Sequence, residues 1–255
     1  MADVDGLAAA MKSLLVFEGP GGLWSVFLEK YFSDVSVRLI RCADKHAAAS
    51  FFDRVSPAAV FIEPSFLNLS LIQKIKVRCQ TDPLFRVYRI GPQASAKNDI
   101  FFHTIFDQPV PHEFEKKWPE TLPLPDIVKL LVIDDEQEIG SMVRDYFEGR
   151  SAPAFEIRHA LNGREGMEAI ERARPDIIIL DIKMPVMDGR EFYHELKRKG
   201  INIPVIIFFD SISGEELREI RKFGTPPAAE KGSRAGALPG LMALIKKTIY
   251  LEGKN

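Results

Sequence analysis

The sequence predicts an α/β protein in which a doubly wound parallel sheet occurs twice, and two observations support this prediction. Short apolar runs alternate with segments whose apolar residues recur at helical spacing, and the second half of the chain shows this alternation five times. Several of the runs are branched and apolar at every position, which is typical of strands buried on both faces of a parallel sheet. The first half of the chain follows the same plan.

In the first half, strands are expected at 13–19, 36–40, 58–62, 85–90 and 100–106. Helices are expected at 23–31, 44–55, 67–80 and around 112–118. Asp44 is the residue type that caps helix N-termini, so we expect it to cap the second of these helices. Residues 107–126 contain five prolines, which predicts an extended linker after the last short helix.

In the second half, strands are expected at 129–133, 154–159, 177–180, 204–209 and 227–230. Helices are expected at 139–147, 163–173, 191–199, 214–223 and 238–249. Two of these strands end in carboxylates, because Asp134 and Asp135 follow the first strand and Asp181 follows the third. Open α/β sheets place their ligands at such strand ends, and three adjacent carboxylates repel one another unless a hard cation neutralises them. The pattern therefore predicts a divalent-cation site.

Composition excludes several other classes of protein. The 255 residues carry a formal net charge of −2 that is nearly equal in the two halves, which offers no basic face for nucleic acid or an anionic membrane. The two cysteines lack metal-ligand spacing. The N-terminus is acidic where a signal peptide is basic, and no apolar run approaches a membrane span, so we expect a cytoplasmic protein.

The two halves align as copies of one domain. Residues 57–63 match 175–181, which sets Glu63 opposite Asp181. Residues 14–19 match 130–135. The first copy is degenerate, because Glu18 and Gly19 replace the acid pair, Glu63 replaces the central aspartate, and Gln108 stands opposite a lysine, Lys231.

The second half resembles the response-regulator receiver domain of bacterial two-component signalling. The matching segments are LLVIDDE, DIIILDIKMPVMDG, PVII and the lysine of AAEKG, within about 128–250. The resemblance implies a flavodoxin-like (βα)5 fold, a five-stranded parallel sheet flanked by helices. We expect a degenerate pseudo-receiver at 12–118, a proline-rich linker at 119–127 and a receiver at 128–252.

The resemblance also implies a role for each matching residue. Asp181 would accept a phosphoryl group from the phosphohistidine of a sensor histidine kinase or a phosphotransfer protein, with Mg²⁺ as the cofactor. Asp135 and Asp181 would ligate the metal together with the backbone carbonyl of Lys183. Asp134 would hold a metal-bound water, and Lys231 would contact the phosphoryl oxygens.

Two positions depart from the family pattern. Phe209 stands where receivers carry a serine or threonine whose hydroxyl bonds the phosphoryl group, and Asp210 follows where a small residue is usual. Ser211 can supply that hydroxyl only if the loop is shifted by two residues. Ala228 stands where the switch aromatic is usual. We therefore expect the phosphorylation chemistry to be intact and the signal to leave through a surface other than the family's usual one.

Several alternatives stay open at this point. The leading hypothesis is a response regulator without an output domain that signals to a downstream protein target; a homodimer is an open option. A constitutive interaction scaffold is the first alternative. A metal-dependent phosphatase is the second, although Lys183 stands where such an enzyme needs an acid. Glu63 is either a mimic of phosphoaspartate or a relic, and the lack of a charge-neutralising pocket favours a relic.

Overall fold

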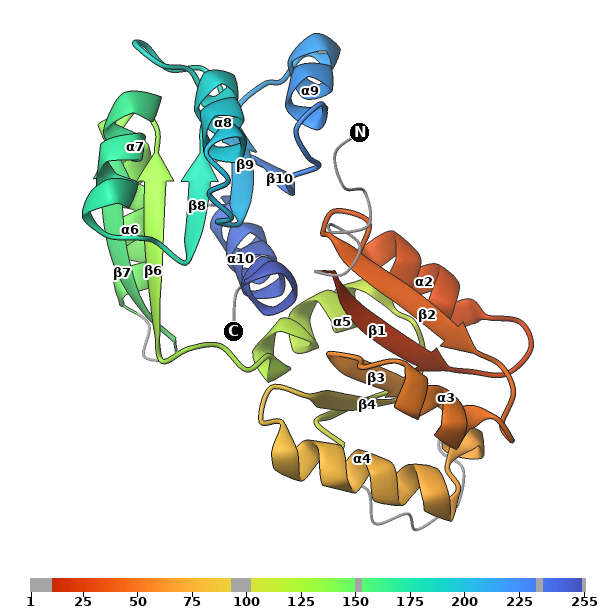
Figure 1. The fold of residues 1–255 in the computed structure, drawn as a ribbon. Helices are drawn as coiled ribbons and strands as arrows, with labels where there is room; N and C mark the ends of the chain where they lie inside the picture. Colours follow the sequence, from red (N-terminus) through yellow and green to blue (C-terminus); the bar gives the residue numbers. More distant parts are fainter. Residues whose placement is uncertain (1–10, 93–101, 150–152, 233–235, 254–255) are drawn as a thin grey trace. The chain divides into compact units, whose positions relative to one another are not determined.

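The computed structural model describes residues 11–92, 102–149, 153–232 and 236–253. The chain divides into two compact units, unit 1 at Met1–Pro123 and unit 2 at Leu124–Asn255. In the described residues each unit contains a five-stranded parallel sheet with helices around it, which confirms the predicted fold class (Figure 1). Among these residues no helix combines the length and the apolar character needed to cross a bilayer.

Unit 1 has the strand order β2-β1-β3-β4-β5. The strands are β1 Lys12–Phe17, β2 Val37–Cys42, β3 Ala59–Ile62, β4 Arg86–Ile90 and β5 Thr104–Phe106. The helices are α2 Leu23–Tyr31, α3 Ala48–Arg54, α4 Leu69–Thr81 and α5 Pro111–Lys117, with 3₁₀ turns η1 at Pro64–Phe66 and η2 at Pro119–Thr121.

Unit 2 has the strand order β10-β9-β8-β6-β7. The strands are β6 Ile127–Ile133, β7 Ala154–Ala160, β8 Ile177–Leu180, β9 Val205–Phe209 and β10 Ala228–Glu230. The helices are α6 Gln137–Glu148, α7 Gly163–Arg172, α8 Gly189–Arg198, α9 Gly214–Arg221 and α10 Leu238–Glu252.

The central strand β8 shows why its sequence is apolar throughout. Ile177 and Ile179 pack into a core with residues of α6 and α10, whereas Ile178 and Leu180 pack into a second core with residues of α7 and α8. Successive strand side chains point to opposite faces of the sheet, so a strand covered on both faces buries every residue.

Three local expectations for unit 1 were wrong. Asp44 does not cap α3, which begins after Ala47; its carboxylate instead accepts the backbone N–H of His46 at 2.9 Å, a turn contact. Within the described residues β5 begins at Thr104, later than predicted, and beside its start the Val87 N–H donates to His103 Nδ1 at 3.0 Å. Residues 100–101 lie outside the described residues. The linker is not extended throughout, because it contains the 3₁₀ turn η2 with Pro119 buried. The domain limits remain a prediction.

The loop between β8 and α8 folds tightly back on the strand end that carries Asp181. The Gly189 N–H donates to the Ile182 carbonyl at 3.0 Å, and a Cβ at Gly189 would lie 2.0 Å from the Asp181 carbonyl oxygen. Val186 has a φ of 69°, and the Met187 N–H donates to the Pro185 carbonyl at 2.8 Å. This strained three-residue turn, centred on a β-branched side chain, leads the chain into α8.

Replacing Gly189 by alanine is expected to destabilise the protein by about 3 kcal/mol, because the added methyl group must displace backbone rather than a flexible side chain. Urea denaturation measures the change. Gly214→Ala is the matched control, since Gly214 also begins a helix behind a capping box and a Cβ there would meet nothing within 4 Å. Equal effects of the two substitutions would contradict the steric account.

Candidate functional site

The three carboxylates predicted from the strand ends meet in unit 2. β6 and β8 are neighbours with Ile133 opposite Leu180, so the residues that follow both strands lie side by side. One oxygen from each of Asp134, Asp135 and Asp181 lies within 4.8 Å of the others. Asp134 and Asp181 are buried and Asp135 is exposed. This oxygen-only set, open to solvent on one side, suits Mg²⁺, which keeps several of its waters.

Lys231 brings a positive charge to the same place. Its Nζ lies 2.9 Å from Asp134 Oδ2 and 3.1 Å from Asp181 Oδ1, and its side chain is only 2% exposed. The edge strand β10 positions it, because β10 pairs in parallel with β9 and the Lys231 N–H donates to the Phe209 carbonyl at 2.7 Å. Two further acids lie near the ammonium, Glu136 at 3.7 Å and Asp210 at 3.9 Å.

Burial and the neighbouring charges act in opposite directions on the pKa of each of these groups. It raises the pKa of Asp134 to about 6, although Lys231 acts in the opposite direction. Burial likewise raises the pKa of Asp181 against the opposing effect of Lys231. For Lys231, burial lowers the pKa, but contacts with Asp134 and Asp181 outweigh it and the net change is upward. Burial therefore works against the ionised form of both acids, which a bound cation would favour.

Backbone groups fix the orientation of the two buried carboxylates. Asp181 Oδ2 accepts the Lys183 N–H at 3.0 Å, and Asp134 Oδ1 accepts the Glu136 N–H at 3.0 Å. The sequence interpretation missed His159, whose Nε2 donates to the Asp134 carbonyl at 2.8 Å. Gly140 leaves room for this ring, because a Cβ there would lie 2.6 Å from His159 Nδ1. The sequence held one sign of this contact, a histidine near the end of β7, the strand that pairs with β6 just before the acid pair.

The atypical positions lie around the same site. Phe209 ends β9 and packs partly buried against the core on the α8 side, and Ala228 is exposed on β10. The Ser211 hydroxyl accepts from Lys183 Nζ at 3.2 Å, which links the loops that follow β9 and β8.

The corresponding positions of unit 1 are occupied by contacts within the chain. Glu18 is 2% exposed; its carboxylate accepts the N–H groups of Trp24 and Ser25 at 3.0 and 2.9 Å and pairs with Arg41 at 3.2 Å. Glu63 accepts the N–H of Gly19 at 3.0 Å. Gln108 is exposed.

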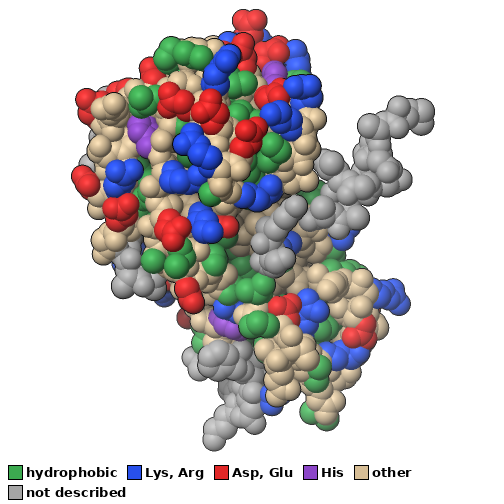
Figure 2. Space-filling model, turned by 60° about the vertical axis from the view of Figure 1, so that its left-hand side comes forward, with side chains coloured by type: hydrophobic (Ala, Val, Ile, Leu, Met, Phe, Trp, Pro, Cys, Tyr) green, Lys and Arg blue, Asp and Glu red, His purple; other side chains and the backbone are tan. Residues whose placement is uncertain are grey.

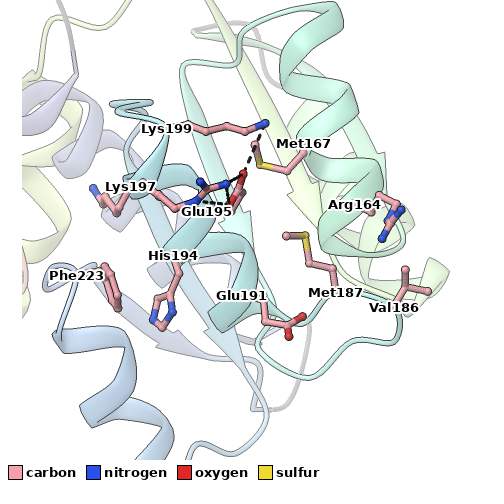
Figure 3. Close-up of a pocket in the computed structure, with 11 residues that line it drawn as sticks. Arg164, Met167, Val186, Met187, Glu191, His194, Glu195, Lys197, Lys199 and Phe223 are labelled. Atoms are coloured by element: carbon pink, nitrogen blue, oxygen red, sulfur yellow. Dashed lines mark hydrogen bonds and ion pairs between the residues drawn. The ribbon is translucent and has the colours of Figure 1, made fainter.

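A surface pocket of about 800 Å³ lies over α8, away from the acids (Figure 3). Met167 and Met187 line one side of it, and the Phe223 and His194 rings lie at the other, with centroids 3.8 Å apart and planes inclined by 36°. Charged side chains around it pair with one another, as Arg198 does with Glu195 at 2.7 Å. On the face shown in Figure 2, acidic and basic side chains are interspersed.

Comparison with known proteins gives consistent matches. Residues 130–231 match the family model of the response regulator receiver domain. The chain is 39% identical over 92 residues to the protein-glutamate methylesterase/protein-glutamine glutaminase of Treponema pallidum, covering 36% of this chain and 22% of that protein. It is 30% identical over 96 residues to the sporulation initiation phosphotransferase F of Bacillus subtilis, covering 38% of this chain and 75% of that protein.

Among solved structures, a Francisella response regulator 1452 receiver domain is 28% identical, covering 47% of this chain and 97% of that one, with a TM-score of 0.41. The chain spans only 21% and 22% of the length of the two Treponema methylesterases that it matches.

The contribution of Asp134 to the stability of the metal-free protein is expected to fall as the pH rises from about 4 to about 6. Asp134 has a pKa of about 6 in the folded chain, against about 4 in an unfolded chain. The unfolded state therefore releases this proton first, and the free energy of unfolding falls across the window. A divalent cation that takes the ionised acids as ligands should raise the thermal midpoint more at about pH 7.5 than at about pH 5, and Mg²⁺ is the cation to test. Thermal unfolding at both pH values measures this.

Asp134→Asn removes the titrating group and should flatten the pH dependence. Asp145→Asn, at an exposed position of α6, is the control and should leave it unchanged. A Mg²⁺ effect of the same size at the two pH values would contradict the assignment.

Proposed function

Because the chain belongs to the response-regulator receiver family through residues 130–231, we propose that unit 2 is a phosphoacceptor of two-component signalling. Asp181 takes a phosphoryl group from the phosphohistidine of a sensor histidine kinase or phosphotransfer protein. The observation that carries the proposal is the buried contact of the Lys231 ammonium with both Asp181 and Asp134, beside the exposed carboxylate of Asp135.

Mg²⁺ fits this acidic set, and Asp135, Asp181 and the backbone carbonyl of Lys183 are the groups proposed to hold it. Asp134 is proposed to bind a water of the metal. When bound, the cation supplies neutralisation of the charge on the phosphoryl oxygens.

The chain's own groups account for the remaining chemistry. One Asp181 oxygen attacks phosphorus, the phosphorus–nitrogen bond of the donor breaks, and an acyl phosphate forms. The Lys183 N–H holds Asp181 Oδ2 at 3.0 Å and so fixes the carboxylate plane. Lys231 contacts Oδ1 before transfer, and it turns to the phosphoryl oxygens as negative charge collects there.

The phosphorylated state is proposed to act on a downstream protein by direct contact. Phe209 offers no hydroxyl to the phosphoryl group and Ala228 offers no aromatic ring to rearrange, which supports a signalling surface other than the one formed by β9, β10 and their helices. The same two residues are the specific observation that favours the second candidate function, a constitutive scaffold.

Unit 1 is proposed to be a degenerate pseudo-receiver that is not phosphorylated. Its proposed limits are 12–118, and a linker at 119–127 precedes the receiver at 128–252. Glu63 is then a relic rather than a phosphoaspartate mimic. Its contact with the Gly19 N–H and the pairing of Glu18 with Arg41 support this, because each carboxylate has a partner within the chain.

Incubation of the full chain with Mg²⁺ and acetyl phosphate is expected to add the mass of one phosphoryl group. Asp181→Asn should abolish the added mass, because the amide cannot attack phosphorus. Glu63→Gln is the matched control in unit 1 and should leave the added mass intact. Intact-protein mass spectrometry measures all three. Absence of phosphoryl mass in the wild-type chain would favour the scaffold, and its persistence in Asp181→Asn would place the acceptor elsewhere.

Amide chemical shifts recorded with and without beryllium fluoride, a phosphoryl mimic, are expected to change most outside β9, β10, α9 and α10. The reason is that Phe209 and Ala228 lack the groups that would carry a rearrangement to that face. Larger changes on those four elements than elsewhere in unit 2 would refute the proposed signalling surface.

A further inference from the structure

More carboxylates lie around the Lys231 ammonium than its single positive charge can neutralise. Four of them lie within 4 Å of Nζ, from Asp134, Asp181, Glu136 and Asp210. The first two form the close contacts and are buried, with side-chain exposures of 2% and 8%. Asp210, at 3.9 Å, is 60% exposed and so approaches the ammonium from the solvent side.

The backbone holds Asp210 in this position. Asp210 directly follows β9, and the Lys231 N–H donates to the carbonyl of Phe209, the last residue of that strand. This bond ties the end of β9 to the residue that follows β10, so Asp210 and Lys231 extend from neighbouring strand ends. Lys183, the other lysine nearby, donates to Ser211 rather than to Asp210.

Phosphorylation of Asp181 would change the charge balance around this lysine. Asp181 exchanges its single carboxylate charge for an acyl phosphate of about two negative charges, a net gain of about one, and Lys231 already touches that carboxylate at 3.1 Å. The Asp210 carboxylate then competes with the phosphoryl oxygens for one ammonium and also repels them. Two like charges a few ångströms apart interact appreciably even near the surface, and added salt screens that interaction.

We propose that Asp210 is a positioning residue that destabilises the phosphorylated form of Asp181 through Lys231. It places a negative charge 3.9 Å from the ammonium, on the solvent side of the site, where it would compete with the phosphoryl group for Lys231. At equilibrium this shifts the phosphoryl group back toward its donor or onward to an acceptor, so that little accumulates on Asp181. The inference rests on the proposed function and adds a limit on how far phosphorylation proceeds.

The test compares beryllium fluoride binding by the full-length wild-type chain and Asp210→Asn, in Mg²⁺, by isothermal titration calorimetry. Asparagine keeps the shape of the side chain and removes its charge. The variant is expected to bind about tenfold more tightly at low ionic strength, and the gain should shrink to about twofold or less in 1 M salt, where the Debye length is about 3 Å. Steady-state phosphorylation by acetyl phosphate should rise in the same direction.

Glu215→Gln is the matched control, because Glu215 is an exposed acid in the first turn of α9 that is not among the four carboxylates near Lys231. It should change the affinity less than twofold. Asp210→Ser, which also removes the charge, should reproduce the gain and so separates charge from any effect specific to asparagine.

The outcomes distinguish this inference from the proposed function. Equal affinity of wild type and Asp210→Asn, with both phosphorylated on Asp181, overturns the role of Asp210 and leaves the phosphoacceptor standing. A gain that is undiminished in high salt also overturns it, because charge would not be the cause. Failure of every variant to bind beryllium fluoride or to take phosphoryl mass overturns the proposed function and this inference with it. Phosphorylation in Asp210→Asn well above the wild-type level supports both.

Discussion

The contact of the Lys231 ammonium with Asp134 and Asp181 is the interaction on which the arrangement of unit 2 depends. Buried charges are costly unless they are paired, and here one lysine is shared between two buried acids. The pairing requires β6, β8 and β10 to end at one edge of the sheet, with β9 as the strand that holds β10 in register. Because burial still raises the pKa of Asp134 and Asp181, one lysine does not fully stabilise the two ionised acids, and a divalent cation has a thermodynamic reason to bind.

The carboxylates at the strand ends are stabilised by different partners in the two units. In unit 2 the acids at the strand ends face a lysine and an open position suited to a cation. In unit 1 the corresponding Glu18 accepts two backbone N–H groups at the start of α2 and pairs with Arg41. Helix N-termini favour negative charge, so this carboxylate is satisfied without a ligand. Closely similar sheets thus hold a cluster of acids around one lysine in unit 2 and, in unit 1, a Glu18 whose charge is paired within the chain.

The solvent side of the site differs from its buried side. Toward the core, Asp134 and Asp181 have defined partners in Lys231, in backbone N–H groups and, through the Asp134 carbonyl, in His159. Toward solvent, Phe209, Asp210 and the Lys183–Ser211 contact take the place of the small and hydroxyl-bearing residues that the family pattern leads one to expect. The buried acids and the exposed Asp210 therefore share one ammonium.

The sequence by itself determined the fold class, the repeat and the meeting of Asp134, Asp135 and Asp181, because apolar runs mark buried parallel strands whose carboxyl ends share one edge of a sheet. It failed for Asp44, which makes a local turn with His46 instead of a helix cap, and for the start of β5, beside which the His103 ring accepts the Val87 N–H. Only the tertiary structure decided that His159 lies under Gly140 and supports Asp134, and that Asp210 shares Lys231. These contacts join residues that are distant in sequence, and the order of strands that brings them together is not encoded in any local pattern.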